Sequence, residues 1–62
     1  MLIKRDIAVQ RLRNGETLRE SGNTMMFSNG DFITAATEIY LRENKLVTIS
    51  GEVGHTNLTW NH

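Results

Sequence analysis

The absence of cysteine from so short a chain is the feature that most limits what this sequence can fold into. A chain of about 60 residues buries only roughly 60% of the surface that its unfolded form exposes, so its own core contributes little stability. Small domains commonly compensate with disulfides, a structural metal or association with another chain. With 62 residues, no cysteine and only His55 and His62 as imidazole ligands, the sequence excludes disulfides and predicts no metal site. We therefore expect one small domain, residues 1–62, that is stabilised by self-association or by a partner.

Composition and charge are those of an ordinary folded domain. Hydrophobic residues make up 39% of the chain and charged residues 23%, which is not typical of a disordered segment. Charged residues follow the N-terminal Met-Leu-Ile at once, and no apolar run approaches the length of a membrane span, so we expect a soluble, cytoplasmic protein. The formal net charge is zero, which argues against a strong electrostatic hold on nucleic acid or anionic lipid.

Turn signals that contain asparagine recur every 15 residues, at Asn14-Gly15, Asn29-Gly30 and Asn44-Lys45. Asn and Gly tolerate the positive φ of a tight hairpin turn, and Asn-Gly between apolar segments is a strong hairpin signature. Gly51 and Gly54 bracket a further turn, after which residues 57–60 are expected to form a last strand. This spacing favours a β-meander.

The segments on either side of Asn44 agree about which face of a sheet would be apolar. If a three-residue loop is centred on Asn44, Leu41 lies opposite Val47. Ile39 then lies opposite Ile49, and the Asn29-Gly30 turn selects the same register. We therefore predict a mainly β fold, a small antiparallel meander or barrel of four to five short strands, with room for one short helix.

A helix at residues 31–43 is the alternative, and it would make the fold α+β. Apolar residues in this segment also fall at helical spacing, and Ser28 or Asp31 could serve as the N-cap. Against the helix stand residues whose branched Cβ atoms suit a strand, namely Ile33, Thr34, Thr37 and Ile39. Residues 1–13 fit either a short helix that ends at Asn14-Gly15 or a strand that pairs across that turn, and we favour the strand.

The titratable residues do not form a recognisable catalytic or cofactor-binding pattern. The acidic residues are scattered along the chain, and His55 lies between Gly54 and Thr56 in a predicted loop. Neither Asn-Gly dipeptide has the strand, glycine-rich loop and helix that a phosphate site needs. We therefore predict no enzyme activity, no catalytic residue, no cofactor and no metal.

Apolar residues on the second face of the predicted sheet carry the main functional hypothesis. One short segment cannot cover both faces, so we predict a protein interface made of Met25, Phe27, Phe32, Tyr40 and Leu46. The occupant would be a second copy in a homo-oligomer or an unidentified protein target. A closed monomeric barrel, in which residues 1–20 cover one face and Leu58 and Trp60 the other, is the competing interpretation. The predicted function is that of a small non-enzymatic regulatory or inhibitory binding protein.

Nucleic-acid binding is the second hypothesis. It depends on a stripe of basic residues in the N-terminal segment, namely Arg5, Arg11, Arg13 and Arg19. Residues 1–20 carry a net charge of +2, from five basic and three acidic residues, and the aromatic residues could offer stacking surfaces. Glu16 and Glu20 lie close enough in sequence to neutralise part of this stripe.

Overall fold

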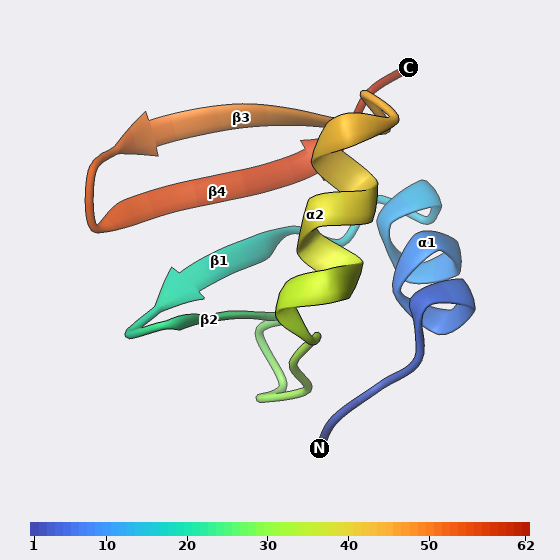
Figure 1. The fold of residues 1–62 in the computed structure, drawn as a ribbon, viewed down its shortest axis with the longest axis horizontal. Coiled ribbons are helices and arrows are strands. Elements are labelled where there is room, and N and C mark those ends of the chain that lie inside the picture. Colours follow the sequence, from blue (N-terminus) through green and yellow to red (C-terminus); the bar gives the residue numbers. More distant parts are fainter.

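The computed structural model describes all residues 1–62 and consists of two short helices packed against a four-stranded antiparallel sheet (Figure 1). The elements are α1 (Arg5–Arg13), β1 (Leu18–Ser21), β2 (Thr24–Met26), α2 (Ala35–Glu43), β3 (Val47–Glu52) and β4 (His55–Trp60). The strands lie in the order β2-β1-β4-β3. The predicted small antiparallel fold with four strands is confirmed, and its α+β form is the one observed.

Helix α2 occupies the segment for which we favoured a strand, so that preference was wrong and the helical alternative is confirmed. Thr34 is the N-cap, and its hydroxyl accepts a hydrogen bond from the backbone N–H of Thr37 at 3.2 Å. Ile33 and Thr34 lie before the helix begins, so their branched side chains do not oppose it. Thr37 and Leu41, four residues apart, are buried on one face of the helix.

Helix α1 likewise replaces the strand that we favoured within residues 1–13. Ala8 and Leu12 are fully buried and again lie four residues apart. Gly15 follows the helix with φ 98°, and its N–H donates to the carbonyl of Leu12 at 2.9 Å. The N–H of Glu16 donates to the carbonyl of Arg11 at 3.1 Å, which completes a Schellman motif. Asn14-Gly15 therefore ends a helix and does not form the predicted hairpin turn.

Asn44-Lys45 ends α2 in the same way, which overturns the hairpin register predicted around Asn44. The N–H of Lys45 donates to the carbonyl of Arg42 at 3.1 Å, and the N–H of Leu46 donates to that of Leu41 at 3.0 Å. Lys45 has φ 54° and is the only non-glycine residue with positive φ. A hairpin turn and a helix C-cap both need this conformation, so the dipeptides alone did not distinguish them.

Tight turns lie within the β3–β4 hairpin and within the segment between β2 and α2. Val53-Gly54 connects β3 to β4, whose register pairs Glu52 with His55, so the predicted turn and last strand are confirmed. Asn29-Gly30 does form a reversal, in which the N–H of Phe27 donates to the carbonyl of Asp31 at 2.7 Å. It returns the chain to an isolated antiparallel bridge between Met26 and Phe32.

The chain is built from two successive αββ units. Helices α1 and α2 each span nine residues and begin 30 residues apart, and each is followed by a Schellman cap and a hairpin. The segments that precede the two helices lie side by side through a parallel bridge between Leu2 and Phe32. Phe32 also bridges to Met26, so these segments extend the sheet beyond β2 but not beyond β3.

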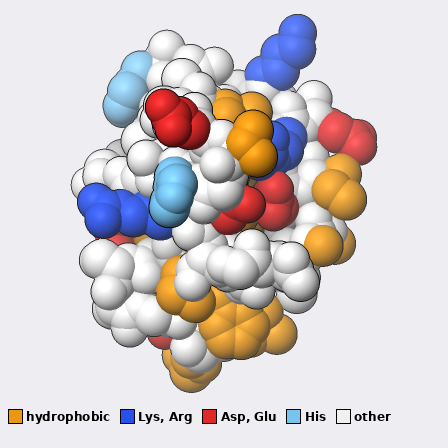
Figure 2. Space-filling view, turned by 90° about the vertical axis from the view of Figure 1, so that its left-hand side faces the viewer, with side chains coloured by type: hydrophobic (Ala, Val, Ile, Leu, Met, Phe, Trp, Pro, Cys, Tyr) orange, Lys and Arg blue, Asp and Glu red, His pale blue; other side chains and the backbone are white.

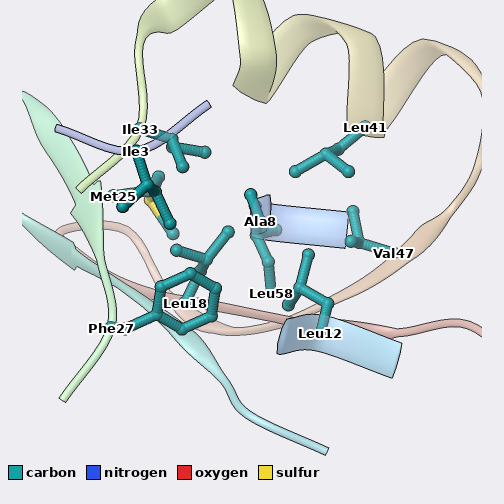
Figure 3. Close-up of a cluster of buried hydrophobic side chains, with 10 residues drawn as sticks. All are labelled: Ile3, Ala8, Leu12, Leu18, Met25, Phe27, Ile33, Leu41, Val47 and Leu58. Carbon is teal, nitrogen blue, oxygen red and sulfur yellow. The ribbon is translucent and has the colours of Figure 1, made fainter. Parts of the chain in front are cut away.

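One hydrophobic core lies between the helices and the inner face of the sheet (Figure 3). Its members are Ile3, Ala8, Leu12, Leu18, Met25, Phe27, Ile33, Leu41, Val47 and Leu58. The strand register places Leu18 beside Leu58 on this face, with Arg19 on the opposite, outer face. We assigned the apolar residues to two faces of a sheet. Most of them instead lie either on one face of the sheet or on the helices that cover it.

Candidate functional site

The predicted interface residues do not form one exposed surface. Met25 and Phe27 are only 3% and 2% exposed and belong to the core. Phe32, Tyr40 and Leu46 are half-buried, and Tyr40 and Leu46 pack against that core. The prediction assumed that residues 31–43 form a strand with two apolar faces. Instead Tyr40 lies on α2, and Met25 points to the inner face of the sheet that the helices cover.

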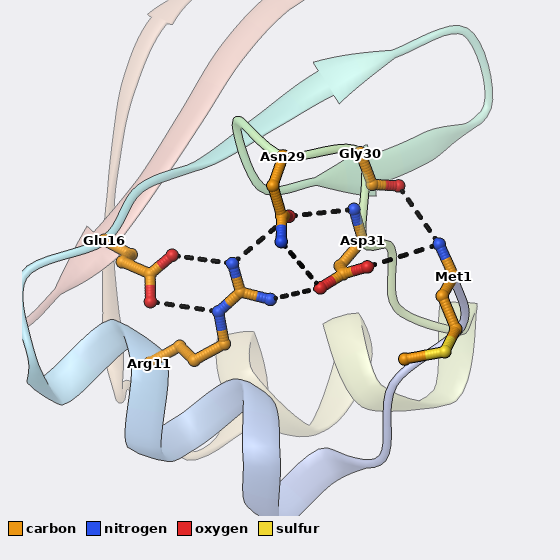
Figure 4. A network of polar contacts seen from close by, with 6 residues as sticks. All are labelled: Met1, Arg11, Glu16, Asn29, Gly30 and Asp31. Atoms are coloured by element: carbon orange, nitrogen blue, oxygen red, sulfur yellow. Dashed lines mark hydrogen bonds and ion pairs between the residues drawn. The ribbon is translucent and has the colours of Figure 1, made fainter.

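Arg11 is the centre of a polar network that joins α1 to two distant segments (Figure 4). Its Nε and Nη2 donate to the two carboxylate oxygens of Glu16 at 2.9 and 2.7 Å. Its Nη1 donates to Asp31 at 2.7 Å, and Nη2 also donates to the side-chain oxygen of Asn29 at 3.2 Å. The guanidinium carbon lies 4.1 Å from the centroid of the Phe27 ring. Charge-assisted, bidentate contacts of this kind are among the stronger polar interactions in proteins.

The network shifts the protonation equilibria of both carboxyl groups downward. The hydrogen bond from Arg11 is the largest cause that lowers the pKa of Glu16. The hydrogen bond from Asn29 is the largest cause that lowers the pKa of Asp31, and Arg11 and the N-terminal amine, 3.3 Å away, add to it. All these partners are engaged with one another, so the network is a structural cross-link between helix, turn and N-terminus.

The structure does not assemble the four candidate nucleic-acid-binding arginines into one stripe. Arg11 is committed to its carboxylate partners. The guanidinium of Arg5 lies 4.3 Å from the Tyr40 ring centroid, and that of Arg13 lies 5.9 Å from the centroid of the Trp60 ring. Arg19 points to the outer face of the sheet, away from α1.

A cleft that the sequence did not predict lies where the two hairpins separate. Strands β1 and β4 pair only at Leu18 with Leu58 and at Arg19 with Asn57, and the hairpins then diverge toward their tips (Figure 1). Beyond this point a side chain replaces the backbone hydrogen bonds between β1 and β4. The Glu20 carboxylate accepts a hydrogen bond from the N–H of Thr56 at 3.2 Å. The two residues are 36 positions apart, so no local pattern links them.

We call this the tip cleft; its volume is about 320 Å³. Glu20 and Thr56 line it from the inner face of the sheet, Glu38 and Arg42 from α2, and Val53 from the tip of the β3–β4 hairpin. Arg42 donates to Glu38 at 3.0 Å, which leaves the Glu20 carboxylate without a cationic partner. Figure 2 shows this end of the molecule, with acidic side chains gathered beside basic and apolar ones.

Several large apolar side chains are exposed, and one of them, Val53, lines the tip cleft. Val53 is 101% exposed, and Ile49, on the inner face of β3, is 53% exposed because neither helix reaches over it. Ile39 is also 53% exposed, on the solvent side of α2. Isolated apolar residues are common on protein surfaces, but a cleft with a carboxylate and adjacent apolar groups is a recognisable binding geometry.

Strand β3 has a free backbone edge. The carbonyl of Leu46 accepts a hydrogen bond from the N–H of Asn61 at 2.8 Å, which sets the alternation of the β3–β4 ladder. By that alternation, Val47, Ile49 and Gly51 direct their N–H and C=O groups away from β4. No segment of the chain pairs with this side of β3.

Comparison of the chain with family models, with curated proteins and with solved structures finds no match. No group of three or more His, Asp or Glu side chains lies close enough together to hold a metal ion. Neither helix has the length and apolar character that crossing a membrane requires.

Proposed function

We propose that this protein is a small non-enzymatic regulatory or inhibitory protein that acts by binding another protein through the tip cleft. The observation that carries the proposal is the separation of the two hairpins, which places an uncompensated carboxylate beside a fully exposed valine. Glu20 uses one oxygen to accept from Thr56, and its second oxygen remains available to a donor from a partner.

The chemistry of the cleft defines the kind of segment that would fit. Two carboxylates, Glu20 and Glu38, face one guanidinium, Arg42, so the cleft favours a positively charged group. A volume of about 320 Å³ accommodates a side chain rather than a whole helix. Val53 offers an apolar contact at the rim. The proposed target therefore presents a Lys or Arg side chain next to an apolar residue.

The proposal includes a homo-oligomeric state and a cytoplasmic setting. A chain of 62 residues gains stability from association with a second copy. The cysteine-free composition is compatible with a reducing compartment.

Affinity capture from the source cells tests the proposal when it is run with matched variants. Val53→Asn removes the apolar contact and suits a hairpin turn, whereas Ile7→Asn removes an exposed apolar residue, 41% exposed, from α1. We expect the wild type and Ile7→Asn to retain the same protein, and Val53→Asn to retain at least about tenfold less.

Glu20→Gln tests the charge of the cleft, because the amide oxygen can still accept from Thr56 while the negative charge is lost. We expect weaker capture and a smaller loss of capture at high salt than for the wild type. Equal retention by wild type, Val53→Asn and Glu20→Gln would overturn the proposed site.

A further inference from the structure

We propose that β3 is the interface of a symmetric homodimer, in which the β3 strands of two copies pair antiparallel to form one continuous sheet with four strands from each copy. This inference deepens the proposed function, since it assigns the surface through which the homo-oligomer forms. It uses the free edge of β3 and leaves the tip cleft open.

The two edges of the sheet differ in how far other segments of the chain cover them. The β2 edge is partly covered, because Phe32 bridges to Met26 and Leu2 bridges to Phe32. The β3 edge carries no such cover, although β3 is among the longest strands of the sheet. Natural proteins usually protect a free edge with proline, inward-pointing charge or a bulge. The β3 sequence Val-Thr-Ile-Ser-Gly-Glu has no proline and no inward-pointing charge, and its only charge is at the end. Its one irregular residue is Gly51, with φ 91°, next to that end.

Backbone geometry selects the register of the pair. The free N–H and C=O groups belong to Val47, Ile49 and Gly51, and in an antiparallel ladder such residues must face one another. A twofold axis at Ile49 pairs Ile49 with its copy and sets Val47 opposite Gly51 in both directions. Gly51 has φ 91°, so the regular part of this ladder runs over residues 47–50. A shift of the axis by one residue either way leaves some of these groups unpaired.

The side chains are self-complementary in this register. A twofold axis perpendicular to the sheet keeps both sets of helices on one side, so the two half-exposed Ile49 side chains meet on the inner face. Val47 lies opposite Gly51, which has no side chain to obstruct it. On the outer face Thr48 lies opposite Ser50 of the other copy, which is a favourable hydroxyl pair.

Charge complementarity also favours a second copy as the occupant. Lys45 precedes β3 and Glu52 ends it, so this register sets Glu52 opposite Leu46 of the other copy, one residue along the chain from that copy's Lys45. No like charges face each other across the pair. A second copy therefore satisfies the backbone, the apolar side chain and the charges of this edge together.

Sedimentation equilibrium or light scattering on the full chain tests the dimer. The structure offers a matched pair of variants, because Ile49 and Ile39 are both 53% exposed and only Ile49 lies on β3. We expect Ile49→Lys to raise the dimer dissociation constant by about tenfold or more and Ile39→Lys to leave it unchanged. Circular dichroism confirms that both variants keep the fold.

Crosslinking gives a second, independent readout, because the chain has no cysteine of its own. Paired residues at this position of a ladder have Cα atoms about 5.5 Å apart, which is within the range of a disulfide. We expect Ile49→Cys to form a covalent dimer on mild oxidation, and Ile39→Cys to remain monomeric under the same conditions.

Any one of three results would overturn the dimer. The first is a wild-type chain that is still monomeric at about 100 micromolar. The others are a dimer that Ile49→Lys does not weaken and the failure of Ile49→Cys to crosslink. These outcomes are separate from those for the tip cleft, which lies beyond the paired edge. Loss of target capture by Val53→Asn with no change in mass would leave only the cleft supported, and the reverse pattern would leave only the dimer supported.

Discussion

Replacement of Lys45 by glycine should stabilise the protein. Lys45 holds φ 54° in the Schellman cap of α2, where Gly15 with φ 98° occupies the equivalent position after α1. The left-handed conformation costs a non-glycine residue about 1–2 kcal/mol. Glycine loses more backbone freedom on folding, which costs about 0.5–1 kcal/mol. The balance predicts a gain of about 0.5–1 kcal/mol for Lys45→Gly.

Lys45→Ala is the matched control, because it removes the same charged side chain and keeps the strained conformation. Urea unfolding followed by circular dichroism, at one protein concentration, gives the free energy of unfolding of each variant. In a domain of this size the expected gain raises the melting temperature by roughly 2–8 °C relative to Lys45→Ala. If Lys45→Gly is no more stable than Lys45→Ala, the argument from backbone strain is refuted.

Three further predictions concern the Arg11 network, the core and nucleic acid. The pKa values of Glu16 and Asp31 are lowered on folding, so their stabilising contribution is complete above the ordinary values of 4.5 and 3.8 and is lost as the pH falls below them. Urea unfolding should therefore show that the free energy of unfolding falls between pH 7 and pH 3, and that it falls less in Arg11→Met than in the wild type. An equal fall in the wild type and in Arg11→Met would contradict this. Leu58→Ala should destabilise the fold by about 2–5 kcal/mol, because Leu58 is fully buried in a central strand, and a change below about 1 kcal/mol in thermal or urea unfolding would count against the core described above. Because the four arginines are dispersed, fluorescence anisotropy at two salt concentrations should show no salt-dependent binding to single-stranded or duplex oligonucleotides, and such binding would restore the nucleic-acid hypothesis.

The αββ repeat accounts for the unequal edges of the sheet. The extended segment before α2 covers the strand that ends the first unit, and the segment before α1 joins it through the bridge from Leu2 to Phe32. The equivalent strand of the second unit is β4, which lies in the middle of the sheet, so β3 is left at the other edge without such a segment. The proposed dimer supplies a strand there from a second copy.

Several elements follow from the local sequence alone. Gly51 and Gly54 identified the turn between β3 and β4, and the alternating residues after it identified the last strand. Asn29-Gly30 identified a reversal of the chain. In both cases Gly, or Asn with Gly, supplies the backbone conformation that a tight turn needs, and the turn is local to these residues.

The two remaining asparagine signals needed tertiary information. Asn14-Gly15 and Asn44-Lys45 supply a residue with positive φ, which suits a hairpin turn and a helix C-cap equally. The choice is made by burial: Ala8 with Leu12, and Thr37 with Leu41, form helical stripes that a sheet face can cover. That sheet face is formed by strands from both units, so a local sequence pattern does not reveal it.

The candidate site depends even more on tertiary structure. Composition predicted a small chain that gains stability by association, and the scattered titratable residues predicted binding rather than catalysis. The tip cleft exists because Glu20 meets Thr56, 36 residues away, where β1 and β4 part. The free edge exists because the strand order places β3 last, beyond β4. Strand order and long-range contacts arise only when the two units pack, so tertiary structure alone decided where the cleft and the free edge lie.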